Sequence, residues 1–149
     1  MPDSERLQET RAFFGPRAAT WDERFPNDSP KFAAALQHLQ LQHGSVAVDV
    51  GCGRGRALPH LQRSVGPGGF VIGLDVAPGM CVRARECGWV ILGDAGRLPL
   101  PTAACDAVFA AGLLNHLPDP PLGLAEFARV TRPGARLALF HPIGRSALA

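Results

Sequence analysis

An apolar run that leads directly into a glycine-rich loop constrains this chain more than any other feature. The run covers residues 46–50, and glycine follows at positions 51, 53 and 55. Because valine recurs along it, the run predicts a strand buried on both faces of a parallel sheet. Alternate glycines let the backbone turn sharply, adopt positive φ and lie directly against a ligand.

The residues after the loop predict a helix that points at the same ligand. Leu58, Leu61 and Val65 repeat at helical spacing, and the free N–H groups at a helix start favour the negative or polar end of a ligand. A strand, a glycine loop and a helix in this order predict a nucleotide site. The GxGxxG spacing of dinucleotide sites would place a small residue where Arg56 stands, so a nicotinamide-dependent oxidoreductase is the weaker alternative.

The glycine spacing, with Asp49 before it, resembles the first motif of the class I S-adenosylmethionine-dependent methyltransferases. Asp75 ends a second apolar run, 70–74, about twenty residues after the loop, where a carboxylate can accept both ribose hydroxyls. The alternative is that Asp75 only caps the helix opened by Pro78. The resemblance therefore implies a ribose contact at Asp75.

The resemblance continues towards the C-terminus in the order that the family has. Asp94 follows a third apolar run, 89–92, and the resemblance assigns it to the adenine amino group, with a plain turn residue as the alternative. A fourth run, 105–110, leads to the segment 113–117, at the sheet edge where open α/β sheets bind ligands. Residues 129–134 are expected to close a helix before a fifth strand over 135–140.

These runs predict an α/β fold: a Rossmann-like, doubly wound, mostly parallel sheet with strand order 3-2-1-4-5. Residues 45–149 are expected to form the S-adenosylmethionine-binding domain, without the last two strands that the resemblance implies. An open sheet edge of this kind predicts a homodimer or marginal stability. The missing strands normally shape the acceptor pocket, so a cofactor-binding domain without turnover is an alternative.

Residues 1–44 are expected to form a helical cap, or lid, of the same domain. Ser29 and Pro30 predict the start of a helix that covers one sheet face and ends at Gly44. Upstream, the resemblance implies that Phe14 and Trp21, with Asp22, close over the cofactor. The alternative is that these aromatic side chains complete the core.

The resemblance implies S-adenosylmethionine as the cofactor, S-adenosylhomocysteine as the product and a small molecule as the methyl acceptor. The implied cofactor residues are Asp49, Gly51, Cys52, Gly53, Gly55, Asp75, Val76, Met80, Asp94, Ala95, Ala111 and Leu113. On the acceptor side, Phe14, Trp21, Asn115, His116 and His141 are the candidates. His116 is the best-placed general base, because the unperturbed pKa of histidine is near 6.5.

Composition and charge bear on the partners, the location and the metal content expected of this protein. The net charge is only +2 and the arginines are dispersed, which disfavours a nucleic-acid partner. No apolar stretch is long enough to span a bilayer, and the N-terminus lacks a signal-peptide pattern, so a cytoplasmic protein without membrane contact is expected. The four cysteines fall at no metal-ligand or redox spacing, which predicts no metal site and reduced thiols.

Overall fold

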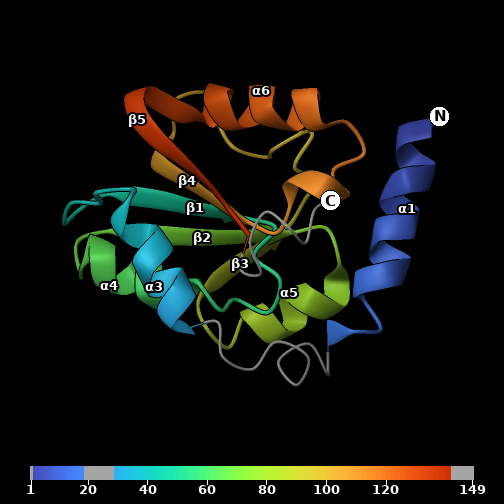
Figure 1. The fold of residues 1–149 in the computed structure, drawn as a ribbon, viewed down its shortest axis with the longest axis horizontal. Helices are drawn as coiled ribbons and strands as arrows, with labels where there is room; N and C mark the ends of the chain where they lie inside the picture. Colours follow the sequence, from blue (N-terminus) through green and yellow to red (C-terminus); the bar gives the residue numbers. More distant parts are fainter. Residues whose placement is uncertain (1, 19–28, 142–149) are drawn as a thin grey trace.

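The chain folds into a 5-stranded parallel sheet with helices on both faces (Figure 1). A computed structural model describes residues 2–18 and 29–141. The helical elements are α1 (Pro2–Phe14), α3 (Ser29–Gln37), α4 (Leu58–Val65), α5 (Pro78–Ala84), the 3-10 turn η2 (Leu114–His116) and α6 (Pro120–Val130). The strands are β1 (Val46–Val50), β2 (Phe70–Asp75), β3 (Trp89–Leu92), β4 (Cys105–Ala111) and β5 (Thr131–Phe140).

The strand order is β3-β2-β1-β4-β5, with each neighbouring pair parallel, which confirms the predicted fold class. β1 lies at the centre, where Val50 is opposite Leu74 of β2. Because parallel strands end at the same edge of a sheet, the loops after β1, β2 and β4 gather there. In Figure 1, the arrows of β1, β2 and β4 point towards this edge, and α1 lies beyond it.

Two apolar layers enclose the sheet. On one face, Leu61 of α4 and Phe32 of α3 belong to the same buried cluster as Ala47. On the other face, Val48 of β1 belongs to a cluster with Phe127 of α6. This alternation along β1 follows from the two-residue period of a strand, and it explains why the run is apolar throughout.

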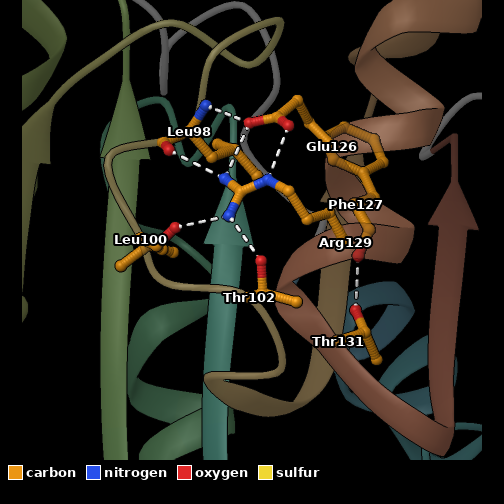
Figure 2. A network of polar contacts seen from close by, with 7 residues as sticks. All are labelled: Leu98, Leu100, Thr102, Glu126, Phe127, Arg129 and Thr131. Atoms are coloured by element: carbon orange, nitrogen blue, oxygen red, sulfur yellow. Dashed lines mark hydrogen bonds and ion pairs between the residues drawn. The ribbon is translucent and has the colours of Figure 1, made fainter.

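The connection between β3 and β4, residues 93–104, is a loop held by one arginine (Figure 2). The Arg129 guanidinium on α6 donates to the carbonyl oxygens of Leu98 (3.1 Å) and Leu100 (2.9 Å). It also pairs with Glu126, with 2.7 Å from Nε to Oε1, and Glu126 Oε2 accepts the Leu98 N–H at 2.8 Å. Two prolines disfavour a helix here, so side chains of α6 satisfy the backbone instead.

The helix predicted to run to Gly44 ends earlier, at Gln37. The N–H groups of His38, Leu39 and Gln40 bond to carbonyls three residues back, and Gln40 has a φ of 49°. This tightening ends the α-helix before the chain reaches Gly44. Gly44 instead lies in a later turn and donates to the Val65 carbonyl at 2.8 Å.

The fifth strand begins earlier than predicted. β5 starts at Thr131, directly after α6, although the Pro-Gly pair was expected to separate helix and strand. Cys105 pairs with Thr131 and Ala107 with Arg136, so β5 bulges between these pairs. Gly134 has a φ of 81° and permits this irregularity.

Candidate functional site

The loops at the carboxyl ends of the strands enclose a cavity of about 360 Å³, a volume typical of small-molecule sites. Its walls come from the segments after β1, β2, β3 and β4, from the end of β5 and from α1. The predicted site residues that line it are Phe14, Asp49, Gly51, Cys52, Gly53, Asp75, Val76, Met80, Asp94, Ala95, Ala111, Leu113, Asn115, His116 and His141. The structure therefore brings together residues that the sequence places more than 100 positions apart.

The glycine loop after β1 lies against the end of β2. Gly51 and Cys52 donate their N–H groups to the Leu74 carbonyl at 2.7 and 3.0 Å. Gly51 and Gly53 have φ values of 69° and 54°. A Cβ at Gly51 would lie 2.7 Å from Leu113 Cδ1, whereas a Cβ at Gly53 would have no atom within 4 Å. The loop thus leaves open space at Gly53, on the cavity wall.

Gly55 differs from the other two loop glycines, because it does not line the cavity within the described ranges. A Cβ there would lie 3.1 Å from Leu58 Cδ1 and 3.2 Å from the Ala84 backbone. Gly55 therefore allows the loop, α4 and α5 to pack closely. A cofactor contact at Gly55 stays a prediction, whereas the structure shows this glycine in a packing role.

Asp75 supports both the glycine loop and the turn before α5. Its Oδ2 accepts the Gly53 N–H and its Oδ1 accepts the Ala77 N–H, both at 2.9 Å. The side chain is buried, which raises the pKa of Asp75, while these backbone N–H groups oppose the rise. The alternative that Asp75 caps α5 does not hold, because the N-cap residue is Ala77, whose side chain makes no capping hydrogen bond; Asp75 Oδ1 instead holds the turn before α5. Because a carboxylate has about four lone-pair sites, Asp75 can still accept ligand hydroxyls.

Asp49 is a buried carboxyl group whose polar atoms are not all satisfied. It is 2% exposed, and its Oδ1 has no hydrogen-bond partner among the described residues. Burial raises the pKa of Asp49 well above its usual value, and the charge of Asp75 raises it further. Burying such a group without a partner is costly, so a cationic or donor group of a ligand would stabilise it.

Asp94 follows β3 and has a turn role as well as a place on the cavity wall. Its Oδ1 accepts the Gly96 N–H at 2.8 Å. This bond matches the alternative of a turn residue. Asp94 is only half-buried, and it lines the cavity beside Ala95.

The α1 helix spans the mouth of the cavity. Arg6 Nη1 donates to the Pro118 carbonyl at 2.8 Å, after β4, and Arg11 Nε donates to the Val76 carbonyl at 2.9 Å, after β2. Phe14, at the end of α1, lines the cavity, and its role as a lid residue stays a prediction. The other predicted lid residues, Trp21 and Asp22, lie outside the described residues.

Two histidines line the cavity, after β4 and after β5. His116 ends η2 and is in edge-to-face contact with Phe14, with ring centroids 4.9 Å apart. Burial lowers the pKa of His116, and the charge of His141 lowers it further. His141 follows β5, and its Nδ1 is buried without a hydrogen-bond partner in the described part of the chain.

Several cavity residues are absent from the predicted set. Leu7, Thr10 and Phe13 line it from α1, where the apolar residues show no helical periodicity that would have identified them. Arg54 and Arg56, beside the loop glycines, are half-buried and also line the cavity.

Residues 2–18 and 29–141 also show how this chain compares with the requirements of a cysteine nucleophile, a metal site and a membrane-spanning helix. Burial raises the pKa of the Cys52 thiol far above its usual value, which keeps it protonated and argues against a nucleophile. No group of three His, Cys, Asp or Glu side chains in these ranges could hold a metal ion. No helix in them is both long and apolar enough to cross a membrane.

Comparison with known proteins points to one family. The model of the methyltransferase domain family matches residues 48–139. The nocamycin O-methyltransferase of Saccharothrix syringae is 38% identical over 116 residues, which cover 72% of this chain and 41% of that protein. The demethylmenaquinone methyltransferase of Geobacillus kaustophilus is 37% identical over 107 residues, covering 66% of this chain and 46% of that protein.

Solved structures agree with this match. The crystal structure of an S-adenosylmethionine-dependent methyltransferase from Aquifex aeolicus superposes with a TM-score of 0.67 at 32% identity. The match covers 72% of this chain and 62% of that chain. This chain spans less than half the length of the two curated relatives named above.

Proposed function

Because this chain belongs to the methyltransferase domain family, we propose that its cavity binds S-adenosylmethionine and that it transfers the methyl group to a small-molecule acceptor. One observation carries the proposal: the buried Asp49 carboxyl, with an unpartnered oxygen, lies on the same cavity wall as the positive-φ glycine loop. S-adenosylmethionine has an ammonium and a sulfonium group, so a cation of this kind compensates the buried carboxyl.

The residues present fit this cofactor. Asp75 would accept the ribose hydroxyls, Asp94 with Ala95 would meet the adenine, and Gly51 and Gly53 would let the backbone lie against the methionine part. The remaining contacts are apolar, or come from the backbone, and would be made by Cys52, Val76, Met80, Ala111 and Leu113. When bound, S-adenosylmethionine supplies a methyl group already activated by the sulfonium.

The chain's own residues then need only position the reactants, exclude water and, for some acceptors, remove a proton. Methyl transfer is accelerated mainly by holding the reacting atoms in near-attack geometry and excluding water. α1 excludes water at the mouth, and Asn115 and His141 orient the acceptor. His116, kept neutral by its lowered pKa, is the base for an acceptor that must lose a proton.

A second candidate is a domain that binds the cofactor without turnover. The match covers 41% of the nocamycin enzyme, so turnover by that whole enzyme is not carried over to this chain. Release of S-adenosylhomocysteine from S-adenosylmethionine in the presence of a panel of small hydroxylated and amino acceptors separates the two candidates. Product above the acceptor-free background indicates turnover.

Isothermal titration calorimetry tests the cofactor site without knowledge of the acceptor. The wild-type chain is expected to bind S-adenosylmethionine and S-adenosylhomocysteine and not NADH. Asp75→Ala should lose this binding, whereas Glu86→Ala, which removes an exposed carboxylate, should keep it. A folded wild-type chain that binds NADH, or neither sulfur compound, contradicts the proposal.

We also propose that two copies associate through β5. β5 is an edge strand of the sheet, and Leu137 and Leu139 on it are 40% and 45% exposed. An exposed edge with apolar side chains is a template for pairing with another strand. Light scattering that reports a stable monomer at high concentration would contradict this proposal.

A further inference from the structure

The two phenylalanines that end α1 flank the ring of His116, an exposed residue. The Phe14 ring lies edge to face with it at 4.9 Å and 85°, and the Phe13 ring lies stacked at 6.2 Å and 26°. Phe13 and Phe14 also contact one another edge to face at 4.9 Å. These are favoured geometries for pairs of aromatic rings, and all three side chains line the cavity.

Polar contacts do little to fix the same ring. Within the described ranges, the hydrogen-bonding contact of His116 is with Asn115, whose Nδ2 is 3.5 Å from His116 Nε2. That distance is at the long limit for a hydrogen bond. A catalytic imidazole is often oriented by a carboxylate or carbonyl at its second nitrogen, and no such contact is present here in the described part of the chain. The orientation of His116 therefore depends on the aromatic rings.

The position of those rings depends in turn on how α1 docks. Arg6 bonds to the carbonyl of Pro118, two residues beyond His116, and Arg11 bonds to the carbonyl of Val76 across the cavity mouth. Phe14 also packs against a small buried cluster that includes Met80 of α5. Docking of α1 thus fixes both phenylalanines against the segment that contains His116.

We propose that Phe14, with Phe13 beside it, is a positioning residue for His116, so that docking of α1 both closes the cavity and prepares the base. The base role itself rests on the proposed function. The imidazole nitrogen would use its lone pair to bond the acceptor's proton, whose former bonding electrons stay on the acceptor atom. The resulting imidazolium then gives the proton to water.

The charged and titratable groups around His116 favour the neutral imidazole that a base requires. His141 faces it from the end of β5, Arg6 reaches its segment from α1, and Asp119 follows it and caps α6 through the Leu122 N–H. Burial by the surrounding groups lowers the pKa of His116, and the charge of His141 acts in the same direction. A neutral imidazole is the state that can accept a proton.

Histidine titration by NMR tests this inference without an acceptor, with the His116 signal assigned by its loss in His116→Gln. In Phe14→Leu, the pKa of His116 should rise towards the ordinary value of about 6.5 as water reaches the ring. Arg11→Gln keeps both rings but loosens α1, and it should shift the pKa in the same direction. Phe70→Leu removes an aromatic ring that contacts Trp89, and it should leave the pKa unchanged.

An unchanged His116 pKa in both Phe14→Leu and Arg11→Gln would overturn the positioning role. Arg11→Gln also decides the question if Phe14→Leu does not fold. Calorimetry on the wild-type chain keeps the two proposals separate. If S-adenosylhomocysteine does not bind, the proposed function fails and the base role with it, whereas an unchanged pKa with binding intact overturns only the positioning role.

Discussion

Substitution of Gly53 by alanine isolates the contribution of the glycine loop to cofactor binding. Gly53 has a φ of 54°, and an added Cβ would meet no atom within 4 Å, so the methyl group causes no clash in the free protein. The expected loss of stability therefore comes from the backbone alone. The left-handed conformation costs a residue with a Cβ about 1–2 kcal/mol. Reduced freedom of the unfolded chain offsets about 0.4–1 kcal/mol of this.

The net loss is about 1 kcal/mol, which for a chain of this length lowers the thermal midpoint by about 3 °C. Gly44→Ala is a matched control: Gly44 has a φ of 88°, also with open space around its Cβ, and lies before β1 at the opposite end of the strand. Both variants should lose similar stability in thermal unfolding. Only Gly53→Ala should also lose affinity for S-adenosylhomocysteine.

Calorimetry on the two variants gives the decisive comparison. If the methionine part of the cofactor lies against the loop, the methyl group at position 53 displaces it. Binding is then weakened at least about tenfold, or by about 1.4 kcal/mol. Gly44→Ala should bind as the wild type does. Equal affinities in Gly53→Ala and Gly44→Ala would refute the argument that the loop is open because a ligand occupies that space.

Three further predictions concern stability. The pKa of Asp49 is raised in the folded state, so above the ordinary carboxyl pKa of about 3.9 the folded state binds more protons than the unfolded chain. Asp49 therefore lowers the free energy of unfolding as the pH rises. Asp49→Asn should stabilise the fold more at about pH 8 than at about pH 5. A thermal-midpoint difference that is constant with pH would count against this. Arg129→Gln should lower the thermal midpoint and speed hydrogen exchange at the Leu98 amide, because the loop 93–104 loses its donors; unchanged exchange there would show that the network of Figure 2 does not hold the loop. Leu61→Ala should cost about 2–5 kcal/mol in urea unfolding, because Leu61 is fully buried in the core, and a loss under about 1 kcal/mol would contradict the packing.

The sheet could be predicted because its determinants are local in sequence. Each of the five apolar runs is short, and four of them have glycine or aspartate directly at one or both ends, so their positions are visible without tertiary information. The order of motifs in the resemblance then supplied the strand order that the structure confirms. Asp49, Asp75 and Asp94 reach the cavity for the same reason: each lies at or just after the carboxyl half of a strand.

The features that the sequence does not reveal depend on contacts between distant segments. The hydrogen bonds of Arg6 and Arg11 fix α1 across the cavity, yet neither arginine belongs to a recognisable motif. The early start of β5 depends on pairing with β4, and Gly55 faces α5 because of how the loop packs. The roles of the cavity residues in binding and catalysis stay predictions.

Amide chemical shifts of the ¹⁵N-labelled chain during titration with S-adenosylhomocysteine locate the cofactor site residue by residue. Saturable shifts are expected for the amides in the glycine loop, in the turn after Asp75 and in the Asp94 turn, with little change at Gly44 and Gly134. These last two amides lie outside the cavity wall as the structure describes it. No saturable shift, or shifts confined to the groove between α3 and β5, would contradict a cofactor site at the carboxyl ends of the strands.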